Sequence, residues 1–191
     1  LDDPGRYTEA TPYTPSRPYS SAAAGSDLLV RAGVRCFDGA ATLSDCSNNY
    51  GPWQHIEKVS PRQITNILEG YRPRVYGSGA NVRDWLYVED HARALELVAT
   101  EGRSGESYNV GGRSERTNLA VVEAICDILD EKRPRRKGAR HRDLITFVSD
   151  RPGHDRRYAI DASKIERELG WSPRESFETG LAHTIDWYLA N

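Results

Sequence analysis

The regular alternation of short apolar runs with amphipathic segments is the feature that most constrains the fold of this chain. The amphipathic segments predict helices at residues 19–34, 60–70, 89–100, 117–129, 161–169 and 177–189. The apolar runs predict strands at residues 40–46, 74–77, 83–88 and 108–110, and a further short run covers 144–148. Because strands that alternate with helices are typical of α/β proteins, the sequence predicts an α/β fold.

Local sequence signals predict where these helices begin and which of their side chains face the core. The expected N-caps are Ser60 (with Pro61 as first helical residue), Thr117 and Asp161. The expected apolar faces carry Leu28, Leu29 and Ala32 in the first helix, and Ala92, Leu95, Leu97 and Val98 in the third. Residues 1–18 have no apolar period and are expected to be irregular. Residues 47–52 are expected to form a polar turn at the carboxyl end of a strand, where open α/β sheets bind ligands.

Composition excludes several classes of protein. The 26 basic and 28 acidic residues give a net charge of −2, which argues against a general nucleic-acid binder. No apolar run reaches membrane-spanning length and no signal peptide is visible, so no membrane partner is expected. Three cysteines without metal-ligand spacing fit a reduced cytoplasmic protein, and no metal site is expected. The chain contains no methionine, so we expect a fragment or a processed chain.

The candidate binding loop is Asp150-Arg151-Pro152-Gly153-His154-Asp155-Arg156-Arg157-Tyr158. Its proline and glycine indicate a turn, and its planar guanidinium groups suit bidentate capture of phosphate. Tyr158 and His154 could stack on a base or bond a hydroxyl. The alternative is a solvated loop whose arginines pair with Asp150 and Asp155.

Other motifs carry weaker signals. Tyr19 begins a predicted helix, where a lysine four residues later would favour the phenolate and complete an acid/base pair. The fourth residue is Ala23, and a lone tyrosine is more often a packing residue. The adjacent amides of Asn48 and Asn49 suit hydroxyls and a carboxamide, although an Asx turn is the alternative. Residues 132–142 hold seven basic residues without an interleaved aromatic, which favours a solvated loop over a nucleic-acid patch.

Several motifs follow one another in an order and spacing that resemble one family. They are Tyr19-Ser20-Ser21, Cys46 to Pro52, Glu57-Lys58, Arg83-Asp84-Trp85-Leu86-Tyr87-Val88-Glu89-Asp90-His91, Tyr108 to Gly112, Asp150 to Tyr158, Glu168 to Trp171 and Trp187 to Leu189. Together they closely resemble the dTDP-glucose 4,6-dehydratases, a family of extended short-chain dehydrogenases/reductases. The resemblance runs from Leu1 to Asn191.

This resemblance implies part of an NAD-binding Rossmann fold, whose N-terminal strands are missing, and a smaller α/β substrate-binding domain. Residues 1–47 and 83–101 would belong to the Rossmann-like domain, and residues 48–82 and 102–191 to the domain that binds a nucleotide sugar. The implied reaction oxidises the glucose 4-hydroxyl by hydride transfer to NAD. It then removes water across the 5 and 6 positions and returns the hydride to position 6, giving a 4-keto-6-deoxy sugar.

The resemblance also implies residue roles. Tyr19 would take the proton of the 4-hydroxyl, and Tyr19 and Asn49 would contact NAD. The residues that would hold dTDP-glucose, or a related nucleotide sugar, are Asn48, Glu57, Lys58, Arg74, Val75, Tyr76, Arg83, Asn118, Asp150, Arg151, Pro152, Gly153 and His154. A homodimer contact or an N-terminal partner segment is expected to cover the apolar faces that an incomplete sheet would expose.

Departures from the family pattern bear on activity. The Gly-rich dinucleotide fingerprint is absent, and so is the Thr-Asp-Glu run that supplies the acid and base of the elimination. Ala23 replaces the lysine partner of Tyr19, and Asp45 stands where asparagine is usual. Three hypotheses follow: the C-terminal part of a dehydratase, a non-catalytic nucleotide-sugar-binding module or degenerate homologue, and a basic-loop interaction protein. The net charge makes the third the weakest.

Overall fold

The computed structural model describes residues 5–135, 138–150 and 155–191, and it confirms the α/β fold. The helices are α1 (Pro18–Phe37), α2 (Val59–Leu68), α3 (Val88–Glu101), α4 (Asn118–Lys132), the short 3-10 helix η2 (His141–Leu144), α5 (Ser163–Leu169) and α6 (Phe177–Ala190). The strands are β1 (Leu43–Cys46), β2 (Asn48–Tyr50), β3 (Arg74–Tyr76), β4 (Val82–Tyr87), β5 (Ser107–Val110), β6 (Glu115–Thr117), β7 (Thr146–Val148) and β8 (Arg157–Tyr158). No helix in these described ranges is long and apolar enough to cross a bilayer.

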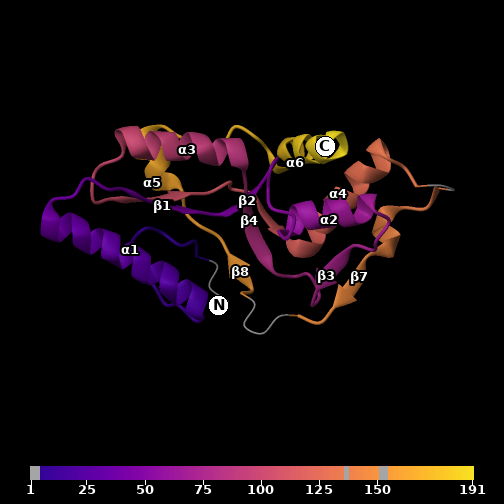
Figure 1. The fold of residues 1–191 in the computed structure, drawn as a ribbon, viewed down its shortest axis with the longest axis horizontal. Coiled ribbons are helices and arrows are strands. Elements are labelled where there is room, and N and C mark those ends of the chain that lie inside the picture. Colours follow the sequence, from indigo (N-terminus) through magenta and orange to yellow (C-terminus); the bar gives the residue numbers. More distant parts are fainter. Residues whose placement is uncertain (1–4, 136–137, 151–154) are drawn as a thin grey trace.

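Strand β4 is the central element of the sheets. It pairs in parallel with β2 and β8 and antiparallel with β6, whereas β1 pairs with β5 and β3 with β7, both in parallel. Helices α1, α3 and α5 lie towards one end of the molecule, and α2 and α4 lie towards the other with β3 and β7 (Figure 1). The strand pairs cross the predicted domain boundaries, because β1 and β4 each pair with strands assigned to the substrate domain. The division into two domains stays a prediction.

Two hydrophobic cores lie on the two sides of β4. Its side chains alternate, so that Trp85 and Tyr87 enter the larger core while Leu86 enters the smaller one. The larger core is filled mainly by α2, α4 and α6, and the smaller one by α3, β5 and α5. Both cores therefore depend on the register of this one strand.

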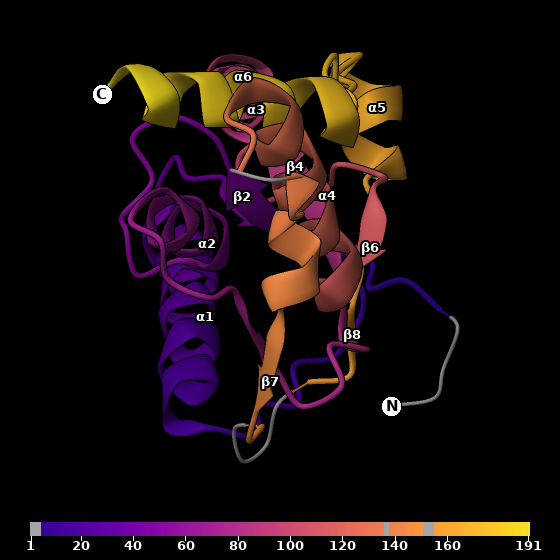
Figure 2. The same cartoon turned by 90° about the vertical axis from the view of Figure 1, so that its right-hand side faces the viewer.

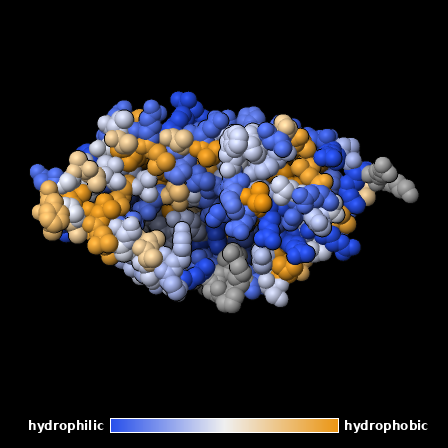
Figure 3. All heavy atoms as spheres, viewed as in Figure 1, coloured by the Kyte–Doolittle hydropathy of each residue, from blue (hydrophilic) through white to orange (hydrophobic). Residues whose placement is uncertain are grey.

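The apolar face of α1 does not pack into the described structure. The helix has no buried residue, and Leu28 and Leu29 are 56% and 74% exposed. Hydrophobic atoms gather at the left end of the space-filling view, where α1 lies in the ribbon view (Figures 1 and 3). Contacts that hold the helix are polar, such as the bond from Arg31 Nη2 to Ser107 Oγ at 2.8 Å. Leu28 and Leu29 therefore contribute to neither hydrophobic core.

Several predicted boundaries are wrong in detail. The Asn48–Tyr50 segment is strand β2 and not part of a turn, because it pairs with β4 and buries Tyr50. Helix α2 begins at Val59, so Lys58 and not Ser60 is its N-cap residue. Helix α5 begins at Ser163, and the Asp161 carboxylate instead accepts the Ser163 amide at 2.8 Å.

The inward face of α3 also differs from the prediction. Its buried residues are Asp90, Ala94 and Val98, whereas Leu95 is 42% exposed. Val98 is buried as predicted and Leu97 packs against the smaller core, but the prediction missed Asp90, whose polar side chain is also buried. The predicted N-cap of α4 is confirmed, since Thr117 Oγ1 accepts the Ala120 amide at 3.1 Å.

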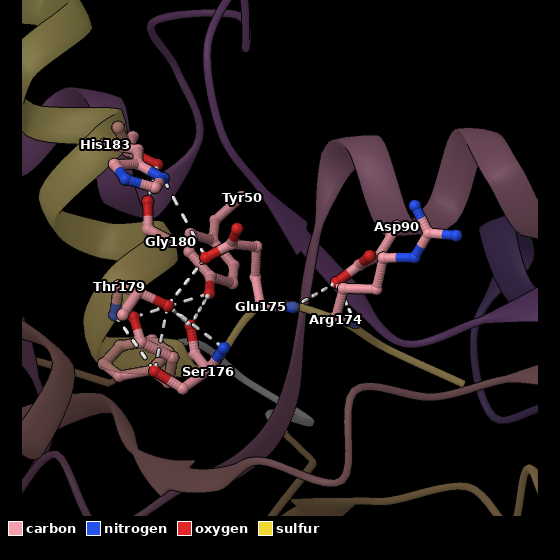
Figure 4. Close-up of polar contacts among 10 residues, drawn as sticks. Tyr50, Asp90, Arg174, Glu175, Ser176, Thr179, Gly180 and His183 are labelled. Carbon is pink, nitrogen blue, oxygen red and sulfur yellow. Dashed lines mark hydrogen bonds and ion pairs between the residues drawn. The ribbon is translucent and has the colours of Figure 1, made fainter.

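Helix α6 packs unusually close to β2 through a glycine. The Tyr50 hydroxyl donates to the carbonyl oxygens of Ser176 and Phe177 at 3.3 and 3.4 Å, which fixes the ring beside the first turn of α6 (Figure 4). A Cβ atom on Gly180 would lie 2.5 Å from the Tyr50 hydroxyl and 3.0 Å from Tyr87 Cδ2. Only glycine fits at this contact without displacing the two tyrosines.

Strands β6 and β8 are joined by an ion pair that also reaches the N-terminal segment. Arg157 donates through Nε and Nη2 to the two carboxylate oxygens of Glu115 at 2.9 and 3.0 Å. Arg6 Nε donates to the same carboxylate at 3.3 Å. The hydrogen bond from Arg157, together with both positive charges, lowers the pKa of Glu115.

The glycine contact predicts opposite effects of the same substitution in two helices. Gly180→Ala should lower the free energy of unfolding by about 1–3 kcal/mol, because the added methyl group overpacks the Tyr50 contact. Gly25→Ala in α1 should instead raise it by about 0.5–1 kcal/mol, since a Cβ there meets nothing within 4 Å and alanine favours helix. Urea unfolding measures both. Equal effects of the two substitutions would contradict the close approach.

The Glu115 carboxylate predicts a pH-dependent contribution to stability. A group whose pKa is lowered by folding stabilises the folded protein above its unfolded-state pKa, here 4.5, and this contribution is lost as the pH falls through the lower folded value. Glu115→Gln should therefore reduce the free energy of unfolding at pH 7, by less than about 1 kcal/mol for a partly exposed pair. The difference should shrink below pH 4.5. The exposed Glu101→Gln is the control, and a pH-independent difference would refute the assignment.

Candidate functional site

Three segments that are far apart in the sequence meet at Asp155, which lies next to the first residues of β4. The Asp155 carbonyl accepts Arg83 Nη2 at 2.8 Å and Asn81 Nδ2 at 3.0 Å. Its carboxylate forms an ion pair with Arg17, the N-cap residue of α1, at 3.0 Å. Asp155 of the predicted binding loop therefore contacts both the start of β4 and the helix that carries Tyr19.

The Arg83 guanidinium is held by carbonyl groups. Its Nη1 donates to the Val82 carbonyl at 2.7 Å, and Nη2 donates to Asp155 as described above. Carbonyl oxygens thereby orient this guanidinium. The neighbouring Arg116 pairs with Glu178 at 2.8 Å. Arg83 is only partly buried, so its fixed positive charge suits an anionic group that approaches from solvent.

A tight turn brings the start of α4 beside this arginine. The amide of Asn118 donates to the Asn81 carbonyl at 2.9 Å, and that of Leu119 donates to the Gly79 carbonyl at 3.0 Å. Gly79 has a φ of +73°, and a Cβ there would lie 2.6 Å from Val75 Cγ1. The turn therefore requires glycine, and Asn118 directly follows Thr117, which is in register with Val82 of the strand that carries Arg83.

The β3 residues lie against the first residue of the predicted loop. Strand β3 pairs with β7, and the Gly77 amide donates to the Val148 carbonyl at 2.8 Å. A Cβ on Gly77 would lie 3.0 Å from Asp150 Oδ2, so Asp150 folds back against the end of β3. Arg74 and Tyr76 are exposed, whereas Val75 is buried in the larger core and could offer a ligand only its main chain.

Strand β2 carries the predicted amides. Asn48 and Asn49 are in register with Trp85 and Leu86 of β4. Asn49 Nδ2 donates to the Ser47 carbonyl at 3.1 Å, whereas Asn49 Oδ1 and Ser47 Oγ are buried without a hydrogen-bond partner in the described part of the chain. Buried polar atoms are seldom left unpaired, so these two indicate a ligand or water with both a donor and an acceptor.

The remaining predicted residues lie on the surface or outside the described ranges. Tyr19 is 87% exposed in the first turn of α1, and Ala23 follows one turn later. Glu57 and Lys58 are exposed immediately before α2, where the Lys58 amide donates to the His55 carbonyl at 3.0 Å. Arg151, Pro152, Gly153 and His154 lie outside the residues that the structure describes.

The sequence analysis missed Asp84, which organises the loop after β5. This carboxylate is 2% exposed and accepts the Gly112 amide at 2.8 Å and the Ser114 amide at 2.6 Å. It thereby fixes the antiparallel start of β6 beside Arg83. The available signal was an acidic residue inside an apolar strand, because a carboxylate is buried only when it is paired or hydrogen-bonded.

Burial raises the pKa values of three acidic groups near the site. It raises the pKa of Tyr158 to about 12, so the phenol is a neutral hydroxyl at pH 7. Burial also raises the pKa of the Cys46 thiol and of the Asp45 carboxyl, the latter helped by the charge of Asp27. Within the described ranges, no three histidine, cysteine or acidic side chains form a group that could hold a metal ion.

Comparisons with known proteins agree on one family. The family model for GDP-mannose 4,6 dehydratase matches residues 2–184. The dTDP-glucose 4,6-dehydratase of Escherichia coli is 57% identical over 185 residues, which cover 97% of this chain and 51% of that protein. The Neisseria gonorrhoeae enzyme of the same name is 57% identical over 187 residues and is covered to 54%.

Solved structures show the same relationship. The Bacillus anthracis dTDP-glucose 4,6-dehydratase in complex with NAD matches with a TM-score of 0.90 at 45% identity, over 100% of this chain and 58% of that one. The Streptomyces venezuelae enzyme with NAD bound matches with a TM-score of 0.91 at 44% identity, over 99% and 56%. These neighbours are Rossmann-fold enzymes.

The chain spans about half the length of the curated relatives that it matches. The identity is spread over nearly the whole chain, and the backbone agrees with the dehydratase structures from end to end. The chain belongs to the GDP-mannose 4,6-dehydratase family and corresponds to the C-terminal half of its dTDP-glucose 4,6-dehydratase members.

Proposed function

We propose that these 191 residues form the half of a dTDP-glucose 4,6-dehydratase that holds the nucleotide sugar. The observation that carries this proposal is the Arg83 guanidinium, which the carbonyl groups of Val82 and Asp155 orient beside the start of α4. It stands beside the Asn81–Asn118 contact, in a chain that is 57% identical to dTDP-glucose 4,6-dehydratases.

Arg83 is the proposed anchor for the diphosphate of the substrate. A guanidinium can bond two phosphate oxygens at once, and the fixed head loses little side-chain entropy on binding. Asn118 offers an amide to the same ligand from the start of α4, where the helix dipole also favours negative charge. Asn48, Glu57, Lys58, Arg74, the Val75 main chain, Tyr76 and residues 150–154 complete the proposed substrate site.

The residues present also fit the nicotinamide end of NAD. A carboxamide carries one acceptor and two donor hydrogens, which is what the unpartnered Asn49 Oδ1 and Ser47 Oγ require. NAD supplies the hydride acceptor for oxidation of the sugar 4-hydroxyl. In this scheme Asn49 positions the nicotinamide, and Tyr19 takes the proton of the 4-hydroxyl through its phenolic oxygen.

The exposed apolar face of α1 supports a partner in the working enzyme. Leu28, Leu29 and Phe37 are all more than half exposed. We assign this face to contact with the NAD-binding half or with the α1 helix of a second copy. The three unpaired cysteines of the described chain suit the reducing cytoplasm as its compartment.

Ala23 favours a second candidate, a nucleotide-sugar-binding module without catalysis. Ala23 lies one turn from Tyr19, where the family pattern expects a cation that stabilises the phenolate. Without this cation and the Thr-Asp-Glu run, Tyr19 would remain a weak base while the substrate site stayed intact. Both candidates bind the nucleotide sugar, and only the first takes part in converting it.

The binding proposal predicts that dTDP binding depends on Arg83. Arg83→Glu should weaken dTDP binding by about 2–5 kcal/mol, because a charged phosphate contact is replaced by repulsion. Isothermal titration calorimetry measures the change, and circular dichroism checks that the variant is folded. Arg167→Glu reverses the charge of an exposed residue on α5, away from the proposed site, and should bind like the wild type. Equal dTDP affinity of wild type and Arg83→Glu would rule out the proposed anchor.

The catalytic proposal predicts that the 191-residue chain alone does not convert dTDP-glucose when NAD is added. Neither the Gly-rich turn for the NAD pyrophosphate nor the elimination acid and base is in this sequence. Formation of the 4-keto-6-deoxy product is followed by its absorbance in alkali. Ala23→Lys should restore turnover only when a dehydratase N-terminal half is supplied. Turnover by the unsupplemented chain, with its mass verified, would contradict this prediction.

A further inference from the structure

The connection between β2 and α2, residues 51–58, joins two parts of the proposed ligand site. Asn49 lies in the strand before it, and Lys58 is both its last residue and the N-cap residue of α2. We call this segment the β2–α2 turn. It lies beside the C-terminal half of α6, and α2 also contacts α6 (Figure 2). The conformation of the turn therefore sets the position of Lys58 relative to Asn49.

Trp53, in the middle of the turn, has a backbone conformation that tryptophan rarely adopts. Its φ of +62° lies in the left-handed region, which is an outlier for a bulky residue. The side chain is 83% exposed, so burial does not account for this conformation. The Trp53 ring instead contacts Trp187 of α6, with ring centroids 4.9 Å apart. Such a conformation persists only where the surrounding structure determines it, and here α6 is part of that structure.

A second contact with α6 fixes the main chain one residue further on. The Tyr188 hydroxyl donates to the Gln54 carbonyl at 2.9 Å. Tyr188 packs against the larger core and lies edge-on to Trp187, with ring centroids 4.8 Å apart, so its ring has a fixed position. Burial raises the pKa of Tyr188, so its hydroxyl is a neutral donor at pH 7. Helix α6 thus holds two consecutive residues of the turn.

Gln54 connects this contact to both parts of the proposed site. Its side-chain Nε2 donates to the Asn49 carbonyl at 2.8 Å, which joins the turn to β2. Its carbonyl belongs to the planar peptide group that leads into His55, and the His55 carbonyl accepts the Lys58 amide at 3.0 Å. The hydrogen bond from Tyr188 therefore orients a peptide group directly before the residue that holds Lys58.

We propose that Tyr188 is a positioning residue of the nucleotide-sugar site, which acts through Gln54 and the β2–α2 turn on Lys58. This inference rests on the proposed function, because it takes Lys58 as a residue that binds the nucleotide sugar. Within the described ranges, the Tyr188 hydroxyl bonds to Gln54 and to no proposed substrate residue. The Lys58 ammonium is a compact charge on a flexible stem, so the place where its main chain is held decides whether it reaches the anionic ligand.

The test is a double-mutant cycle on Tyr188 and Lys58, with dTDP-glucose titrated into the 191-residue chain by calorimetry. Lys58→Ala should weaken binding about tenfold or more, because it removes a hydrogen bond from a charged group. Tyr188→Phe deletes only the hydroxyl that bonds to Gln54, and it should weaken binding by about three- to tenfold. In the Lys58→Ala background the same substitution should change the affinity less than about twofold, since the residue through which it acts is missing.

The matched control is Tyr108→Phe, which removes a tyrosine hydroxyl outside the proposed site. That hydroxyl accepts the Arg103 amide at 3.0 Å. The control should leave the affinity for dTDP-glucose within about twofold of wild type, because the residues concerned share no partner with Lys58. Circular dichroism checks that each variant is folded.

The outcomes separate this inference from the proposed function. Wild-type affinity of Tyr188→Phe, together with weak binding by Lys58→Ala, would overturn the inference and leave the proposed function standing. Equal weakening by Tyr188→Phe in both backgrounds, or equal weakening by the control, would overturn the inference as well. Unchanged affinity of Lys58→Ala, or no binding of dTDP-glucose by the wild-type chain, would overturn the proposed substrate site at Lys58 and this inference together.

Discussion

The alternating burial of strand β4 is the constraint on which the rest of the structure depends. Trp85 and Tyr87 fill one core and Leu86 fills the other, so the strand is a wall shared by both. A shift of one residue would exchange these side chains between the two cores. It would also move Arg83 and Asp84 each to the other face of the strand. The same pairing that builds the cores therefore sets the direction of the proposed phosphate anchor.

Buried carboxylates fasten the segments around this wall. Asp84 holds the loop that leads into β6, and Asp90 accepts the amides of Arg174 and Glu175 at 3.0 and 2.9 Å. Figure 4 shows Asp90 beside Arg174 and Glu175. The Asp90 carbonyl also accepts Trp171 Nε1 at 3.1 Å, so the start of α3 fixes the approach to α6. Removing either carboxylate would leave buried amides unpaired, which is costlier than losing an exposed ion pair.

Local chemistry predicted the elements better than it predicted their partners. Thr117 marked the start of α4 correctly, because an N-cap depends on neighbouring residues alone. Strand β2 was missed because two asparagines are poor strand formers, and its pairing with β4 supplies what the local sequence lacks. The meeting of Arg17, Asn81 and Arg83 at Asp155 joins residues more than 70 positions apart, which no local pattern reports. Family resemblance singled out Arg83, but not the contacts that orient it.

The close packing of α6 has a consequence for synthesis of the chain. The larger core contains Phe177, Leu181 and Ile185 from α6 together with Tyr50 and Ile64, which are made more than a hundred residues earlier. A nascent chain on the ribosome cannot close this core until it has been translated as far as Ile185. The parts of β2 and α2 that α6 covers would stay exposed until then, which makes the unfinished chain a client for chaperones that bind hydrophobic segments.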